Sequence, residues 1–200
     1  MSTQNEQTLQ VYESIAEQYC RSIPLTVEGV NRLWIDKTLG ALPNTASVLE
    51  LGSCSGRDAN YIESKGFVVQ RTDAVEHFIE KLRQQGHTVR QLNVIRDAIP
   101  LKYDLVFANA VLLHLKAGEF KTVCKKIFKS LASGGQFAFS LQEGDGDSWV
   151  ANRSKKPRYF CYWRPDDLES VLFSIGFSTV ETYAVVDDGR KWIKVNAYKK

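Results

Sequence analysis

The sequence lacks several features that would point to other classes of protein. No hydrophobic run reaches the roughly 18 residues of a membrane helix, and the polar residues 1–6 do not resemble a signal peptide. The four cysteines have no spacing typical of zinc ligands, and we predict no metal site; they are Cys20, Cys54, Cys124 and Cys161. We therefore expect free thiols in a reducing cytoplasm and no membrane partner.

The chain also has little excess charge. Its net charge of +3 is too small to imply nucleic acid by itself. A hydrophobic content of 44% and a charged content of 24% are ordinary for a globular protein. A chain of 200 residues is long enough for a sizeable core, and one domain over residues 1–200 is the natural expectation.

Hydrophobic periodicity predicts alternating helices and strands. We expect helices near residues 5–20 and 26–41, then strands over 47–52, 67–73, 88–94, 103–108 and 136–141. Helices should separate these strands, with glycines at their ends, and an apolar stripe marks one over 117–132. After a last helix, two β runs over 178–186 and 191–199 flank an Asp-Gly pair, which predicts a hairpin.

Residues 48–58 carry the strongest functional signal. They read as a buried strand, a tight glycine turn and a helix start, and Asp73 follows where the next strand ends. This layout binds a nucleoside. The dinucleotide fingerprint also needs glycines at positions now held by Cys54 and Arg57. Asp58 would repel a pyrophosphate at the positive end of the helix.

Glu50 also indicates a ligand, because a carboxylate within an apolar strand is costly unless a cation or a hydrogen-bond donor meets it. The α-ammonium of S-adenosylmethionine would satisfy it, and that cofactor carries no phosphate for Asp58 to repel. The alternative is a strand, turn and capped helix with no ligand, which would leave Glu50 without a reason.

Residues 47–140 resemble the core of the class I S-adenosylmethionine-dependent methyltransferases. The pattern Glu50-x-Gly52-x-x-x-Gly56 matches the first motif of that family, with Cys54 at its usual middle glycine. The resemblance implies that Asp73 holds the ribose hydroxyls. It further implies a cofactor site built from Tyr19, Glu50, Gly52, Ser53, Cys54, Gly56, Asp58, Asp73, Ala74, Asn93, Val94 and Asn109.

Two of these positions carry a reservation. The resemblance places Asn93 and Val94 against the adenine, where an aspartate is common, so Asn93 is a departure from the family. Tyr19 belongs to a Tyr-x-x-x-Ala-x-x-Tyr element that begins at Tyr12 and would cover the methionine end of the cofactor. Tyrosines seven residues apart also lie on one face of a helix, so packing is the alternative.

The resemblance also implies the fold. We expect a doubly wound α/β domain with a mostly parallel sheet and a C-terminal antiparallel hairpin. Residues 1–45 would form N-terminal helices, residues 46–141 the cofactor-binding core, and residues 142–200 an acceptor-side segment, the last helix and the hairpin.

Methyl transfer asks little of the protein beyond positioning, and a base is needed only if the nucleophile must lose a proton. His114 is the candidate base, because the loop after the fourth strand borders the reacting methyl in the family. The alternative is a histidine that packs or caps at a helix start.

The acceptor is expected to contact the segment after the fifth strand. Residues 153–164 hold five basic side chains, four aromatic ones and no acid, which suits an anionic or flat body. The predicted acceptor contacts are Arg158, Tyr159, Tyr162, Trp163 and Arg164. A solvated loop with its aromatic side chains in the core is the alternative.

The sequence thus predicts an S-adenosylmethionine-dependent methyltransferase acting on a small molecule that is anionic or aromatic. One alternative is methylation of RNA such as tRNA, because basic and aromatic residues alternate in the same segment. Another is a non-catalytic module that binds S-adenosylmethionine. The oligomeric state stays open.

Overall fold

The computed structural model describes residues 3–99, 102–151 and 156–200. Its helices are α1 (Gln4–Ser22), α2 (Gly29–Gly40), α3 (Arg57–Ser64), α4 (Glu76–Gln84), the short 3-10 helix η1 (Leu112–His114), α5 (Ala117–Ser130) and α6 (Pro165–Ile175). Its strands are β1 (Ser47–Leu51), β2 (Val68–Asp73), β3 (Val89–Gln91), β4 (Tyr103–Ala108), β5 (Leu131–Gln142), β6 (Asp147–Val150), β7 (Arg158–Cys161), β8 (Thr179–Asp187) and β9 (Arg190–Tyr198).

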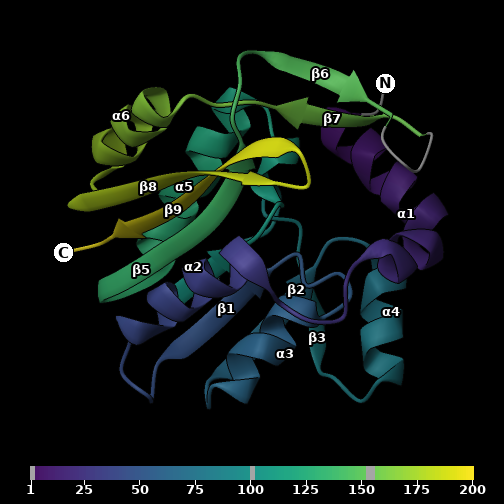
Figure 1. The fold of residues 1–200 in the computed structure, drawn as a ribbon, viewed down its shortest axis with the longest axis horizontal. Helices are drawn as coiled ribbons and strands as arrows, with labels where there is room; N and C mark the ends of the chain where they lie inside the picture. Colours follow the sequence, from purple (N-terminus) through teal and green to yellow (C-terminus); the bar gives the residue numbers. More distant parts are fainter. Residues whose placement is uncertain (1–2, 100–101, 152–155) are drawn as a thin grey trace.

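Seven strands form one sheet in the order β3-β2-β1-β4-β5-β9-β8. The first five are parallel, β9 is antiparallel to β5, and β8 is antiparallel to β9 (Figure 1). The predicted doubly wound, mostly parallel sheet with a C-terminal hairpin is therefore confirmed. The carboxyl ends of β1, β2 and β4 lie side by side, where open α/β sheets bind their ligands.

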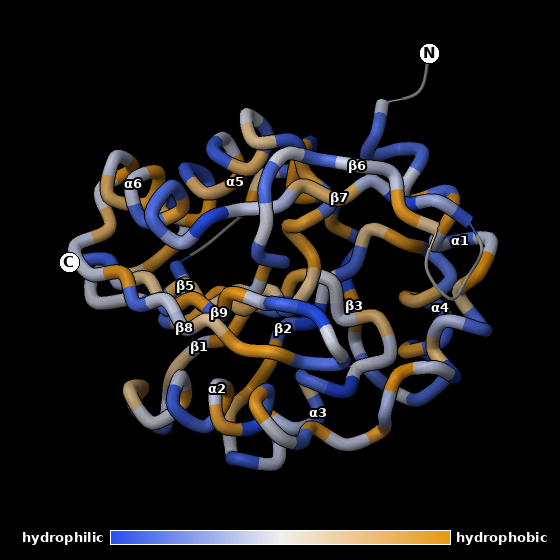
Figure 2. Tube along the Cα trace, turned by 45° about the horizontal axis from the view of Figure 1, so that its top comes forward, coloured by the Kyte–Doolittle hydropathy of each residue, from blue (hydrophilic) through white to orange (hydrophobic). Residues whose placement is uncertain are grey.

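Helices cover both faces of this sheet. Trp34 and Ile35 of α2 and Ile62 of α3 share one core with the β4 residue Phe107. The apolar faces of α5 and α6 belong to the opposite core, together with side chains from β1, β4, β5 and β9. Figure 2 shows the contrast between the hydrophobic central strands and the hydrophilic tip of the β8–β9 hairpin. Among the described residues, no helix combines the length and apolar character that crossing a membrane requires.

The hairpin turn has the geometry that its Asp-Gly pair predicts. Asp188 and Gly189 have φ angles of +49° and +70°, and two consecutive left-handed residues match the twist of the flanking strands. The turn brings Lys191 opposite Val186 and fixes the register of β9. Along its other edge β9 pairs with β5, where Lys194 lies opposite Ser140.

The structure departs from the sequence expectations in three places. β3 is shorter than residues 88–94, and β5 begins at Leu131, before the glycine pair at residues 134 and 135, with a register irregularity there. The segment expected to be a loop after β5 contains the hairpin β6–β7. The residues of β6 and β7 do not alternate clearly between polar and apolar, so the sequence pattern indicates strands only weakly here. Among the described residues, β6 and β7 pair only with each other.

Candidate active site

The turn after β1 is built from residues in the left-handed backbone region. Gly52, Cys54 and Gly56 have φ angles of +72°, +48° and +78°. A Cβ at Gly52 would lie 2.5 Å from Cγ2 of Val111, so the turn approaches the loop after β4 too closely for any side chain. Gly56 is the N-cap of α3 and allows the chain to enter that helix. Cys54 thus occupies a conformation that the glycine usual in the family adopts more easily.

Asp73 ties this turn to the end of β2. Its Oδ2 accepts a hydrogen bond from the backbone N–H of Cys54 at 2.8 Å, and its Oδ1 accepts one from Val75 at 2.9 Å. Burial raises the pKa of Asp73 to about 6, although these backbone donors oppose the shift. A carboxylate with further acceptor capacity therefore stands at the carboxyl edge of the sheet.

Glu50 is buried at the end of β1 and only 3% exposed. Its Oε2 atom has no hydrogen-bond partner among the described residues. Burial, together with the nearby Asp58 carboxylate, raises the pKa of Glu50 to about 8. An unpartnered buried oxygen is costly unless a ligand satisfies it, and the α-ammonium of S-adenosylmethionine is the donor that the sequence predicts.

A cavity of about 810 Å³ joins these groups. It brings together most of the predicted site residues: Tyr19, Glu50, Gly52, Ser53, Cys54, Asp58, Asp73, Ala74, Asn93, Val94, Asn109, His114 and Arg158. Gly56 shapes the turn but does not line the cavity. The space is large enough for a nucleoside cofactor and a small second molecule, since ligand pockets usually enclose about 300–1,000 Å³.

The predicted adenine contact is already engaged within the protein. The Oδ1 atom of Asn93 accepts a hydrogen bond from the N–H of Ile95 at 3.0 Å, and its Nδ2 donates to Oδ1 of Asn5 at 2.9 Å. The side chain thus stabilises its own turn and the start of α1. Asn93 and Val94 still form part of the cavity wall.

A chain of hydrogen bonds crosses the cavity wall from β7 to η1. Nη1 of Arg158 donates to the hydroxyl oxygen of Tyr12 at 2.7 Å, and this hydroxyl lies 2.8 Å from Nε2 of His114. Nδ1 of His114 lies 2.7 Å from the carbonyl oxygen of Tyr159. Because a carbonyl can only accept, Nδ1 carries the proton, and Nε2 accepts the proton of Tyr12.

This arrangement occupies both ring nitrogens of His114. Burial lowers the pKa of His114 to about 4, so the ring is neutral near pH 7. Its one lone pair is directed at Tyr12. The predicted base role stays untested, but within this network any proton reaching His114 would have to pass through the Tyr12 hydroxyl.

Arg158 is a buried cation that lines the cavity and is 5% exposed. Its guanidinium carbon lies 4.9 Å from the ring centroid of Tyr12, 5.4 Å from that of Tyr19 and 5.7 Å from that of Phe160. Its Nε has no hydrogen-bond partner, and no carboxylate pairs with it, among the described residues. Tyr12 packs in a core cluster with Phe78, and its hydroxyl also holds this cation.

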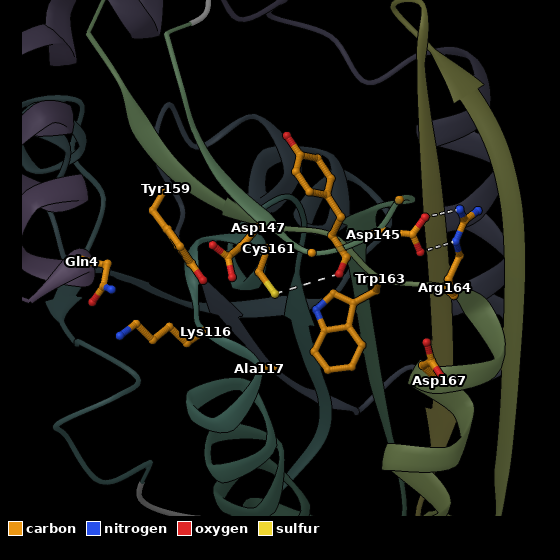
Figure 3. A pocket seen from close by; sticks show the side chains of 13 residues that line it. Gln4, Lys116, Ala117, Asp145, Asp147, Tyr159, Cys161, Trp163, Arg164 and Asp167 are labelled. Atoms are coloured by element: carbon orange, nitrogen blue, oxygen red, sulfur yellow. Dashed lines mark hydrogen bonds and ion pairs between the residues drawn. The ribbon is translucent and has the colours of Figure 1, made fainter.

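The other four predicted acceptor residues lie elsewhere. Tyr159, Tyr162, Trp163 and Arg164 line a second pocket of about 590 Å³, together with Lys116 and Asp147 (Figure 3). Figure 3 shows the Arg164 side chain paired with Asp145, and it also lies 3.6 Å from Glu143. Alternate residues of the β6–β7 hairpin thus face two different cavities. The expectation of a loop in this segment could not predict that separation.

The cavity also contains residues that sequence reasoning missed. Lys194, Trp192 and Arg190 of β9 reach it, as does Asn31 of α2. Lys194 is 3% exposed, and its Nζ lies 2.6 Å from Oδ1 of Asn31 and 3.2 Å from Oδ1 of Asn109. The available signal was a lysine between two apolar neighbours of a strand, Ile193 and Val195, which is weaker than the signal given by Glu50.

Comparison with known proteins agrees with this geometry. The family model of the methyltransferase domain matches residues 25–182. The chain therefore belongs to the methyltransferase-domain family, and it is a class I S-adenosylmethionine-dependent methyltransferase. A search of curated protein sequences gave no match.

Solved structures show the same fold. The 1,6-didemethyltoxoflavin-N1-methyltransferase of Burkholderia thailandensis, solved with 1,6-didemethyltoxoflavin and S-adenosylhomocysteine, has a TM-score of 0.78 at 23% identity, covering 100% of this chain and 92% of its own. DhpI in complex with SAH has a TM-score of 0.73 at 17% identity, covering 96% and 95%. Phosphoethanolamine N-methyltransferase 2 of Haemonchus contortus, with S-adenosyl-L-methionine, has a TM-score of 0.75 at 14% identity, covering 100% and 60%.

Proposed function

We propose that the protein methylates a small molecule that carries an anionic group beside an aromatic or otherwise flat body. The observation that carries this proposal is Arg158. A buried guanidinium cannot lose its charge, and an uncompensated buried charge is expensive. An anionic group of the acceptor would supply the missing partner. The surrounding rings of Tyr12, Tyr19 and Phe160 suit a flat body.

The residues on the cavity wall fit the cofactor. Glu50 offers a carboxylate oxygen to an ammonium group, and Asp73 offers one to ribose hydroxyls. Bound S-adenosylmethionine supplies a methyl group already activated on its sulfonium. The protein then has to place the acceptor in line with that methyl group and exclude water.

Within this proposal His114 is a positioning residue. It accepts the proton of the Tyr12 hydroxyl, so the oxygen of Tyr12 faces Arg158 as an acceptor. This chain fixes the guanidinium without neutralising it, which preserves its charge for the acceptor.

The two alternative functions, methylation of RNA and non-catalytic binding of S-adenosylmethionine, would each require other properties of the protein. Methylation of RNA needs a broad basic surface, whereas Arg164 is paired with Asp145 and Lys156 donates to the hydroxyl of Ser14 at 2.9 Å. Of the five basic residues in this segment, Arg153 and Lys155 lie outside the described residues. A non-catalytic module would bind S-adenosylhomocysteine without methylating any acceptor.

The test uses the variant Arg158→Met, with Lys156→Met as the matched control on the same segment. Acceptors are screened in pairs of aromatic carboxylates and their amides by the release of S-adenosylhomocysteine. We expect the carboxylates to be preferred, and Arg158→Met to weaken acceptor binding by roughly ten- to hundredfold, as for the loss of one charged contact. S-adenosylhomocysteine affinity, measured by calorimetry, should be retained. Equal losses for both ligands, or normal acceptor kinetics in Arg158→Met, would contradict the proposal.

A further inference from the structure

The most unusual unassigned group in the cavity is the amino group of Lys194. It lies on β9, far in sequence from every motif of the cofactor site, yet the register of the sheet places it opposite Ser140 and beside the loop after β4. Its Nζ also lies 4.8 Å from the ring centroid of Trp34 and 5.5 Å from that of Trp192. No carboxylate contacts it directly among the described residues.

Two asparagines hold this amino group from opposite elements. Nδ2 of Asn31 donates to Oδ2 of Asp187 at 2.9 Å, so its Oδ1 is the atom that faces Lys194. Nδ2 of Asn109 donates to Oδ2 of Asp58 at 2.8 Å, so its Oδ1 also faces Lys194. Each amide therefore connects the amine to a carboxylate without letting the two form an ion pair.

This geometry suits a neutral amine that can gain a proton. A neutral amine has two N–H bonds and one lone pair. Because the two amide oxygens accept the two N–H bonds, the remaining position on Nζ belongs to the lone pair. An ammonium formed there would be stabilised through Asn31 by Asp187 and through Asn109 by Asp58.

We propose that Lys194 is the general base that removes a proton from the nucleophilic O–H or N–H of the acceptor. The proposal rests on the proposed function and names the nucleophile that Arg158 leaves unspecified: a weakly acidic hydroxyl or ring N–H. Arg158 binds the anionic group of the acceptor, and Lys194 acts on the atom that is methylated.

The O–H or N–H bond of the acceptor breaks, and its proton moves to Nζ of Lys194. The freed electron pair of the acceptor forms the bond to the methyl carbon as the bond from that carbon to sulfur breaks. The ammonium of Lys194 later returns the proton to water.

The surroundings of Lys194 support this role. Burial lowers the pKa of Lys194 to about 8, the carboxylates of Asp58 and Asp187 oppose that shift, and the guanidinium of Arg57 adds to it. These are the charged groups that act on the amine from α3 and β8. A base with a pKa close to the operating pH is efficient in proton transfer, whereas His114 is a much weaker base whose lone pair is occupied.

The experiment uses 4-nitrophenol as a probe, because its phenolate is coloured and its ionisation is read by absorbance. The complex with S-adenosylhomocysteine is titrated with pH for the natural protein, for Lys194→Met and for Lys191→Met. Lys191 is an exposed lysine on the same strand and serves as the matched control. Methionine has a similar length to lysine, so it fills the same space.

We expect the natural protein and Lys191→Met to ionise bound 4-nitrophenol at lower pH than Lys194→Met does. The ionisation constant should differ by about tenfold or more, as for a phenolate beside a cation. Equal ionisation in Lys194→Met, or no ionisation promoted by the natural protein, would overturn the proposal. Loss of S-adenosylhomocysteine affinity in Lys194→Met with unchanged 4-nitrophenol ionisation would also overturn it, since Lys194 would then contact the cofactor.

A second measurement needs no variant. NMR titration of the lysine Cε–Hε signals should show Lys194 gaining its proton well below the ordinary lysine pKa of about 10.4. Titration at that ordinary value would overturn the proposal. Failure of the natural protein to bind S-adenosylhomocysteine would instead overturn the proposed function, and calorimetry detects that outcome without any acceptor or probe.

Discussion

We expect cofactor binding to release a proton from Glu50, and replacing Glu50 with glutamine tests this expectation directly. With a pKa of about 8, most of the Glu50 side chains are protonated at pH 7. An ammonium ligand binds the ionised form better, so binding should release close to one proton per cofactor. Ionising the group at pH 7 costs about 1.4 kcal/mol, because one pKa unit corresponds to that free energy.

The same shift sets the sign of the stability effect. The folded-state pKa of Glu50 lies above its ordinary value of 4.5, so the folded state binds the proton more tightly than the unfolded state. The stabilisation that the folded state gains by protonating Glu50 is complete below about pH 4.5 and is lost as pH rises towards 8. At pH 7 about 3 kcal/mol of this contribution to the free energy of unfolding has been lost. Glutamine resembles the protonated acid, so Glu50→Gln should raise the free energy of unfolding by up to that amount while it weakens cofactor binding.

Calorimetry of S-adenosylhomocysteine binding in buffers of different ionisation enthalpy measures the proton count. Between pH 6 and 7 we expect affinity to rise by roughly tenfold for the natural protein, and this dependence should be much smaller in Glu50→Gln. Denaturant unfolding of the unliganded protein gives the stability change. The reasoning is refuted if Glu50→Gln releases as many protons as the natural protein, or if it loses stability and affinity together.

Two further predictions concern the turn and the ribose site. Asp73→Ala should weaken S-adenosylhomocysteine binding by roughly tenfold or more by calorimetry, since each charge-assisted hydrogen bond contributes about 1.5–3 kcal/mol; unchanged affinity would remove Asp73 from the site. Gly52→Ala should lower thermal stability more than Gly86→Ala. Both glycines have positive φ, +72° and +89°, but only a Cβ at Gly52 meets another residue, Val111 at 2.5 Å. Left-handed strain alone costs about 1–2 kcal/mol, and equal losses in the two variants would show that this contact relaxes freely.

Local patterns predicted much of the fold. The apolar stripe of α5 and the Asp-Gly pair of the β8–β9 hairpin act over a few residues, so sequence alone sets them. The β6–β7 hairpin escaped prediction because its strands are short and it packs against α1 and η1, which are distant in sequence. The sequence left two alternatives for Tyr159 and Trp163, acceptor contact or burial in the core. It could not show that they line a different pocket from the one that Arg158 lines.

The residues of the candidate site also divide into those that a local motif predicts and those whose position depends on distant parts of the chain. Glu50 and Asp73 were predictable because a motif places them at adjacent strand ends. Lys194 was not, because its place depends on the antiparallel register of β9 against β5, and its partners come from α2 and from the loop after β4. Nothing local to residue 194 specifies either partner.

Three buried ionisable groups on one cavity argue for a ligand of matching charge pattern. Among the residues that the structure describes, Glu50 forms no ion pair and Arg158 pairs with no carboxylate, while two amides separate Lys194 from Asp187 and Asp58. Replacing such groups with apolar residues of similar volume often leaves stability unchanged or improves it, so stability does not account for them. A cationic amino-acid end on the cofactor, an acidic group on the acceptor and a proton to be removed would together satisfy all three. A variant of any one group should therefore alter one ligand or one step, and the Arg158, Glu50 and Lys194 variants separate the three roles.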